Sequence, residues 1–308
     1  MELDPKLREF LDEFNKKPPM YLGIPPYVVR AGIGTDKEPP RKAQISHRFI
    51  PVEGGEVTAR IYTPEGDGPF PVCLFFHGGG FVGGSILGYD YPLHEICLES
   101  KCIIVSVDYR LAPENKFPTC FEDCYAALVW THENAASFNG DPDNIALSGV
   151  SAGGTLTAAV SLMARDRKGP KIKFAAIMYA VLDMGHTLNT KSQNELAEGY
   201  YHNMHSGAVF DAYLIRTEED KLHPFLSPVL IEDLSNLPKT LVMTMEWDLL
   251  RDEGEYYANR LKEAGNDVVY YMAPGVIHNS FIWAEWCPAA KERVNDYFTK
   301  ALHDAMYE

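Results

Sequence analysis

The side chain most clearly placed to take part in a chemical reaction is the hydroxyl of Ser151, in the stretch NIALSGVSAGGTLTAAV (144–160). Gly149 and Gly153 flank it in a G-x-S-x-G pattern, between an expected strand and an expected helix. A serine at such a corner takes a strained backbone conformation and stands clear of the sheet, and glycines prevent collisions around it. The pattern predicts a nucleophilic serine. The alternative is a glycine-rich turn that contains a serine by chance.

A second glycine-rich stretch, HGGGFVGGS (77–85), follows an earlier apolar run. Consecutive glycines are costly to order, so such a run indicates that something approaches the main chain closely. In acyl transfer this would be the oxyanion of a tetrahedral intermediate, and its donors would be the N–H groups of Gly79, Gly80 and Ala152. His77 is either a base or a brace for this loop, and we expect a brace. A phosphate loop is excluded because the GxxxxGK[ST] pattern is missing.

A serine nucleophile needs a base, and the base needs an orienting acid. In a fold of this kind the order along the chain is serine, acid, histidine. The apolar run 240–245 leads into EWDLLRDEG, where Asp248 lies just past the expected strand end, and the run 267–273 leads into PGVIHNSF, which holds His278. Taken alone, each residue has a simpler interpretation: Asp248 as a helix cap, and His278 as a histidine of a surface loop. Their order and placement together predict a triad of Ser151, Asp248 and His278.

The elements that must position these residues alternate between strand and helix. This alternation predicts an α/β fold, with a mostly parallel central sheet and helices on both faces. The expected strands are 46–52, 57–64, 71–77, 102–109, 144–149, 174–182, 240–245 and 267–273, and the expected helices are 88–100, 121–138, 152–166, 253–265 and 289–306.

Two segments do not fit the alternation. Residues 1–45 precede the first strand and are proline-rich, and residues 183–225 form a long insert rich in His, Tyr and Asn. Insertions after the carboxyl ends of parallel strands usually cover the ligand crevice. We therefore expect 1–45 and 183–225 to form a cap over a catalytic domain made of 46–182 and 226–308.

Composition limits the partners. The chain has 308 residues and a formal net charge of −15, without the clustered basic residues that nucleic acid requires. No run approaches the roughly 18 apolar residues of a membrane span, and no secretory signal is evident. The six cysteines have no CxxC spacing, which favours buried, reduced thiols in a cytoplasmic protein. His202 and His205 lack a carboxylate at ligand spacing, so we expect no metal and no cofactor.

At this point the sequence resembles a known family. The segments HGGGF, DYRLAPENKFP, GDPDNIALSGVSAGG and DLLRDEG, with the late histidine loop, are similar to the bacterial carboxylesterases of the hormone-sensitive-lipase branch of the α/β-hydrolases. The resemblance runs from about residue 47 to the C-terminus. It implies Ser151 as nucleophile, Asp248 as acid and His278 as base, with Gly79, Gly80 and Ala152 as oxyanion donors. It also implies a two-part cap, and it suggests either a homodimer formed through an edge strand or a monomer.

Two positions depart from the pattern of that family. Val150 stands where the family usually has Asp, which removes a hydrogen bond that braces the corner, and Asn279 stands where Gly commonly follows the histidine. Asn tolerates unusual backbone angles, so the loop is expected to survive. Within DYRLAPE we expect Asp108, Arg110 and Glu114 to pair beneath the oxyanion loop.

The sequence thus predicts a serine carboxylesterase that hydrolyses small, short-acyl esters through an acyl-enzyme. The aromatic residues Phe81, Tyr89 and Phe281 flank the expected catalytic loops and either line the substrate pocket or belong to the core. Two alternatives use the same fold. One is an amidase or another acyl hydrolase, and the other is a small-molecule receptor without catalysis. Receptors of that kind tend to lose the histidine that is present here as His278.

Overall fold

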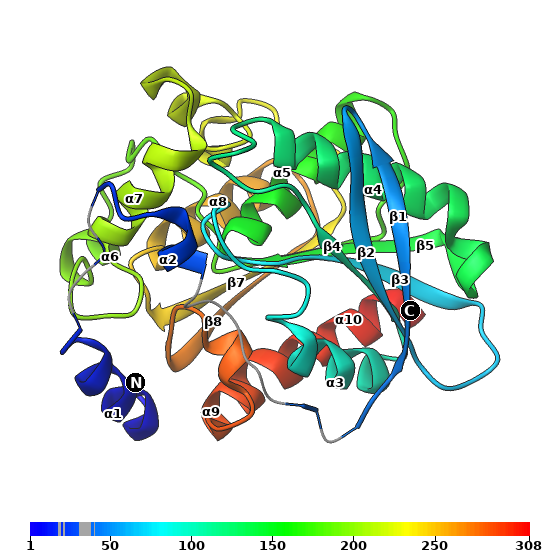
Figure 1. Cartoon of the computed structure of the whole chain (residues 1–308), viewed down its shortest axis with the longest axis horizontal. Helices are drawn as coiled ribbons and strands as arrows, with labels where there is room; N and C mark the ends of the chain where they lie inside the picture. The colour runs from blue at the N-terminus through cyan, green and yellow to red at the C-terminus, as the bar shows by residue number, and fades with distance from the viewer. Residues whose placement is uncertain (18–19, 21, 31–37, 40) are drawn as a thin grey trace.

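The fold is built on one sheet of eight strands. The computed structural model describes residues 1–17, 20, 22–30, 38–39 and 41–308 (Figure 1). The strand order is β1-β2-β4-β3-β5-β6-β7-β8. β1 and β2 form an antiparallel hairpin, β2 is antiparallel to β4, and all other pairs are parallel. The strands are β1 (Gln44–Val52), β2 (Gly55–Thr63), β3 (Phe70–Phe76), β4 (Ile103–Asp108), β5 (Gly140–Val150), β6 (Phe174–Met178), β7 (Lys239–Trp247) and β8 (Val268–Ile277).

Helices cover both faces of the sheet, as the alternation predicted. α4 (Thr119–Asn134), α5 (Ala152–Asp166) and α8 (Arg251–Glu263) pack on one face, and α3 (Asp90–Ser100) and α10 (Tyr297–Tyr307) on the other (Figure 1). Every residue of β3 and of β6 is buried, as expected for central strands covered on both sides. In the described part of the chain, no helix combines the length and the apolar character needed to cross a bilayer.

Some elements differ from the expected ones. β6 ends at Met178 instead of continuing to 182, because Tyr179 adopts a positive φ of 38°, which interrupts the extended backbone. The expected last helix is divided into α9 (Pro288–Ala290), a π-helical turn (Lys291–Asp296) and α10. The early end of β6 turns Tyr179 out of the sheet and toward the carboxyl edge.

The two segments outside the alternation contact each other. α1 (Pro5–Phe14) and α2 (Pro26–Arg30) come from the first segment, and α6 (Lys191–Glu195) and α7 (Met204–Leu214) from the insert (Figure 1). The Asn15 side chain donates to the carbonyl of Gly199 over 2.8 Å, and the rings of Phe14 and Tyr201 have centroids 5.0 Å apart. Several residues of the 1–45 segment, 18–19, 21, 31–37 and 40, lie outside the described chain.

A buried carboxyl group holds the start of the insert against α8. Glu253 accepts a hydrogen bond from the N–H of Leu182 over 2.7 Å and another from the Gln193 side chain over 3.1 Å. Burial raises the pKa of Glu253 to about 8 despite these donors, and the nearby carboxylate of Asp183 adds to the rise. Glu253 therefore gains a proton when the chain folds near neutral pH.

Candidate active site

Ser151 lies at the corner between β5 and α5. Its backbone has φ 54° and ψ −123°, a conformation that non-glycine residues rarely adopt, and its N–H donates to the carbonyl of Met178 over 2.9 Å. A Cβ atom at Gly149 would lie 2.1 Å from the carbonyl oxygen of Gly153, and one at Gly153 would lie 1.9 Å from that of Phe76. The glycines of the G-x-S-x-G pattern are therefore required by backbone contacts on both sides of the serine.

The structure brings Ser151, His278 and Asp248 into one hydrogen-bonded row. His278 Nε2 lies 3.0 Å from Ser151 Oγ, and His278 Nδ1 lies 2.7 Å from Asp248 Oδ2. An ionised carboxylate only accepts hydrogen bonds, so Nδ1 carries the proton and Nε2 presents a lone pair to the hydroxyl. The hydroxyl of Ser148, three residues earlier, instead donates to the Leu74 carbonyl inside the sheet.

Asp248 is almost fully enclosed at the end of β7. Its side chain is 1% exposed, and its Oδ1 accepts the N–H of Leu250 over 3.1 Å. Burial disfavours the charged form, but the field of His278 and the two hydrogen bonds outweigh it and keep the pKa of Asp248 below its ordinary value. The carboxylate is thus held ionised and oriented toward the imidazole.

The loops that carry the acid and the histidine are tied together. Glu246, near the end of β7, accepts the N–H of Gly275 in β8 over 2.7 Å. The pairing of these strands shifts register between Met245 and Trp247, which marks an irregularity just before Asp248. This side-chain bond fixes the ends of β7 and β8 relative to each other at the point where the two functional side chains emerge.

The HGGGF loop lies against Ser151 from the β3 side. A Cβ atom at Gly78 would lie 3.2 Å from Ser151 Cβ, and Gly79 and Gly80 have φ of 127° and 60°. Within the described residues, no hydrogen bond occupies the N–H groups of Gly79 and Gly80. They and the N–H of Ala152, at the start of α5, are the free donors beside the hydroxyl.

His77 acts as a brace for this loop. It is fully buried, its Nδ1 donates to the Gly78 carbonyl over 2.8 Å, and its ring stacks on Tyr109 at 4.2 Å between centroids. Tyr109 donates to the His77 carbonyl over 2.7 Å, and Tyr89 accepts the N–H of Gly78 over 3.1 Å. Burial lowers the pKa of His77, so the ring is neutral. These contacts fit the bracing role, and among the described residues no hydrogen bond joins the His77 ring to Ser151.

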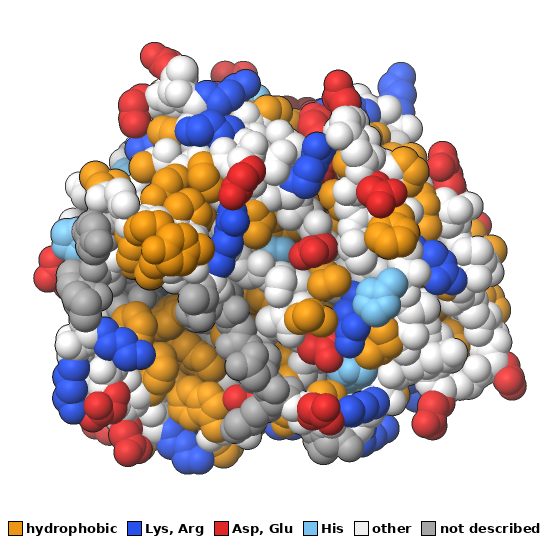
Figure 2. Space-filling view, in the orientation of Figure 1, with side chains coloured by type: hydrophobic (Ala, Val, Ile, Leu, Met, Phe, Trp, Pro, Cys, Tyr) orange, Lys and Arg blue, Asp and Glu red, His pale blue; other side chains and the backbone are white. Residues whose placement is uncertain are grey.

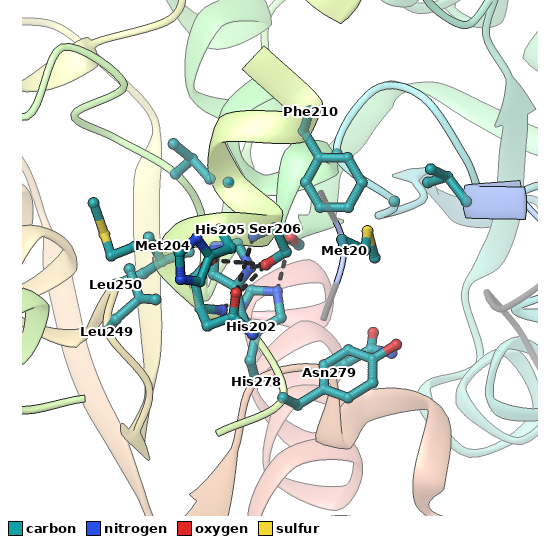
Figure 3. A pocket seen from close by; sticks show the side chains of 18 of the residues that line it. Met20, His202, Met204, His205, Ser206, Phe210, Leu249, Leu250, His278 and Asn279 are labelled. Carbon is teal, nitrogen blue, oxygen red and sulfur yellow. Dashed lines mark hydrogen bonds between the residues drawn. The ribbon is translucent and has the colours of Figure 1, made fainter. Parts of the chain in front are cut away.

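A cavity of about 660 Å³ opens above Ser151 and His278 (Figure 3). A hollow lined with hydrophobic side chains is visible between the positions of α1 and α2 (Figure 2). Phe81 and Tyr89 are among the residues that line this cavity. Phe281 does not line it and belongs to the core, the second of the two placements given for it above. Its ring is fully buried and stacks on Phe75 at 5.6 Å in the core behind the histidine loop.

Contrary to our expectation, the charged residues of DYRLAPE (108–114) do not pair with one another. Arg110 pairs instead with Asp123 in α4, at 2.6 Å, and Glu114 pairs with Arg30 of α2, also at 2.6 Å. Asp123 follows DYRLAP by ten or more residues, and helical packing rather than local spacing brings it close. The Arg110 pair joins the loop after β4 to α4, away from the reacting atoms.

The two departures from the family pattern are accommodated locally. Val150 is fully buried in the apolar core beside β3 and β6, and the corner is held by the backbone bond to Met178. Asn279 has φ 69°, in the left-handed region that asparagine tolerates, as expected. Asn279 and Tyr201 of the insert both line the cavity.

Sequence reasoning missed two side chains that touch His278. Tyr179 meets the imidazole edge-on at 5.0 Å between centroids, and His202 of the insert lies 4.6 Å from it. His205 points elsewhere and lies 3.6 Å from Glu198. The only available signal was the concentration of His and Tyr in the insert, which does not indicate which ring reaches the site.

Comparisons with known proteins agree with this geometry. Residues 73–282 match a family model described as the alpha/beta hydrolase fold. An arylesterase of Saccharolobus solfataricus is 41% identical over 74% of this chain and 74% of its own length. The carboxylesterase NlhH of Mycobacterium tuberculosis is 33% identical over 94% and 92%. A hyperthermophilic esterase structure from Pyrobaculum calidifontis superposes with a TM-score of 0.90 at 33% identity and covers 99% of each chain.

The eight-stranded sheet, the glycine-flanked serine corner and these matches lead to one assignment. The chain belongs to the α/β-hydrolase family, in the carboxylesterase branch that resembles hormone-sensitive lipase.

Proposed function

We propose that the protein is a serine carboxylesterase in which Ser151 attacks the ester carbonyl. His278 takes the serine proton at Nε2 and later gives it to the leaving alcohol, while Asp248 holds the imidazole and stabilises its charged form. The observation that carries the proposal is the pair of contacts of 3.0 Å and 2.7 Å that join the three side chains. The acyl-enzyme is then hydrolysed by a water that His278 activates.

The negative oxygen of the tetrahedral intermediate would be held by main-chain donors. We assign this role to the N–H groups of Gly79, Gly80 and Ala152: the first two have no partner among the described residues, and α5 begins at Ala152, directly after Ser151. Gly80 cannot carry a side chain, because its Cβ would lie 2.3 Å from the ring of Phe210. The chemistry requires no metal or cofactor.

The substrates would be small esters with short acyl chains. The N-terminal segment and the insert would act as a two-part cap, since both contribute walls to the cavity of about 660 Å³. That volume falls within the range of small-molecule pockets. In a series of p-nitrophenyl esters we expect kcat/KM to peak at a short chain. A rate that rises steadily to palmitate would overturn the short-acyl assignment.

The assignment to ester hydrolysis has a direct test. Ser151→Ala should lower kcat on p-nitrophenyl butanoate by about 10⁴-fold or more, and only the wild type should be labelled by a fluorophosphonate. Matched ester and amide substrates separate an esterase from an amidase. The contact between His278 Nε2 and Ser151 does not favour the receptor alternative, and the esterase names of the relatives do not favour the amidase.

Location and assembly are further parts of the proposal. All six cysteines are free and buried, which supports a reducing compartment such as the cytoplasm. The edge strand β8 exposes 44% of Val269 and 38% of Met272, and such an edge can pair with a second copy. Light scattering after size-exclusion chromatography would distinguish a homodimer from a monomer.

A further inference from the structure

His202 is the insert residue that packs most closely on the proposed base. Its ring centroid lies 4.6 Å from that of His278, with the ring planes inclined by 33°. It lines the cavity just before α7, and Figure 3 shows it above His278 with Ser206 beside it. No step of the mechanism described above uses this imidazole.

The hydrogen bonds around Ser206 determine which nitrogen of His202 carries the proton. The Ser206 hydroxyl donates to the carbonyl of Asn203 over 2.8 Å and lies 3.1 Å from His202 Nδ1. A hydroxyl has a single hydrogen, and a carbonyl oxygen only accepts, so both contacts are hydrogen bonds only if Ser206 donates to Asn203 and accepts from His202. His202 therefore carries its proton on Nδ1, and Nε2 has a lone pair.

This lone pair is unused and accessible. Among the described residues no hydrogen bond involves His202 Nε2, and this nitrogen is not one of the enclosed polar atoms that lack a partner. Burial, together with the nearby His278, lowers the pKa of His202 to about 3. The ring stays neutral at ordinary pH, so Nε2 remains an acceptor.

The cavity wall around this acceptor is mostly apolar. Its hydrophobic members come from the N-terminal segment, the insert and the loop after β7, and include Phe14, Met20, Val28, Phe210, Leu249 and Leu250. In such surroundings, a well-placed acceptor next to the reacting atoms distinguishes a ligand that can donate a hydrogen bond from one that cannot.

The reaction decides which part of the ester meets His202. This inference rests on the proposed function, in which His278 Nε2 delivers a proton to the leaving oxygen. That oxygen must therefore come within hydrogen-bond distance of His278, and His202 packs on the ring of that histidine. We propose that His202 Nε2 accepts a hydrogen bond from a hydroxyl or N–H in the alcohol part of the substrate, so that the enzyme prefers monoesters of diols and similar hydroxylated alcohols over plain alkyl esters.

Two pairs of butanoate esters test the preference. Each pair replaces a methyl group by a hydroxyl of similar size: propyl against 2-hydroxyethyl, and butyl against 3-hydroxypropyl. For at least one pair we expect the wild type to favour the hydroxyl ester by about three- to tenfold in kcat/KM, the value of one net hydrogen bond. His202→Phe keeps a ring against His278 but removes the acceptor, and it should bring both ratios close to one. The methyl ether 2-methoxyethyl butanoate, which cannot donate, should gain no preference.

Controls separate a lost hydrogen bond from damage to the site. Rates are expressed per active site, counted by fluorophosphonate labelling, so that unfolded protein does not contribute. His202→Gln, which retains an acceptor, should recover part of the preference. His223→Phe makes the same substitution in the same insert away from the cavity, and it should leave the ratio as in the wild type.

The outcomes separate this inference from the proposed function. If His202→Phe hydrolyses both esters with the wild-type ratio, or if the preference follows a hydroxyl on the acyl chain instead, the role of His202 is refuted while the esterase assignment stands. If the wild type hydrolyses none of these esters and is not labelled, the proposed function itself fails.

Discussion

Asp248→Asn is the change that most directly tests the proposed site. Oδ1 of Asp248 accepts from the N–H of Leu250, and Oδ2 accepts from His278 Nδ1. An asparagine offers one accepting oxygen and one donating amide. Because the N–H of Leu250 can only donate, the oxygen stays there and the amide faces Nδ1. The imidazole must then move its proton to Nε2, which lies 3.0 Å from the Ser151 hydroxyl. The base would be lost while the packing is retained.

The expected loss is large. In a serine protease, the same Asp-to-Asn substitution leaves the histidine in the wrong tautomer and lowers kcat by about 10⁴-fold. This corresponds to about 5.5 kcal/mol of transition-state stabilisation, at about 1.4 kcal/mol per tenfold. We expect a decrease of this order in kcat on p-nitrophenyl butanoate, with KM little changed. Urea denaturation should show that the variant is folded.

A nearby carboxylate provides the matched control. Asp252 lies in the same DLLRDEG segment, accepts the N–H of Ser192 over 2.7 Å and pairs with Arg251, without touching His278. Asp252→Asn should keep kcat within about threefold of the wild type, the scale of a surface polar contact. The reasoning would be refuted if Asp248→Asn kept a tenth of the wild-type kcat, or if the two variants lost activity equally.

Three further predictions concern stability, measured by urea denaturation. Gly153→Ala should destabilise the fold by about 3 kcal/mol or more, because its Cβ would lie 1.9 Å from a backbone oxygen, and a wild-type midpoint would contradict this. Arg110→Met leaves the 1%-exposed carboxylate of Asp123 without its ion-pair partner and should lower the free energy of unfolding by about 3 kcal/mol. Arg167→Met breaks the exposed pair with Glu122 and should lower it by under about 1 kcal/mol. Equal losses in the two variants would show that burial of the pair does not matter. The raised pKa of Glu253 means that the native chain holds a proton which the unfolded chain releases above about pH 4.5, so wild-type stability contains a contribution that falls from pH 5 to 8. Glu253→Gln removes that contribution, and its stability relative to the wild type should rise over this range by on the order of 3 kcal/mol; a constant difference would contradict the shift.

The sheet and the order of the motifs could be predicted because their signals are local. Each central strand is a short apolar run. The candidate catalytic residues follow such runs, and so they lie at the same edge of the sheet. Ser151, Asp248 and His278 therefore meet once the parallel order is established. The glycines around Ser151 are required by close backbone contacts. Because they lie next to Ser151 in the sequence, this signal is local too.

Other features depend on packing between distant segments. The end of β6 at Met178 is set by the positive φ of Tyr179, which leaves no periodic pattern in the sequence. Arg110 pairs with Asp123 because α4 passes over the loop after β4. The contact of His202 with His278 requires the path of the insert, which has only short helices and irregular turns.

The bond between Glu246 and Gly275 joins the strands that carry two of the three proposed catalytic side chains. The carboxylate and the imidazole emerge from strands fastened to each other, whereas the hydroxyl stands on β5, with β6 between them. When the strands shift relative to one another on heating, Asp248 and His278 should move together. The distance that should change most is the one between His278 Nε2 and Ser151 Oγ. Loss of turnover on warming would then precede melting, as a misalignment of two intact halves.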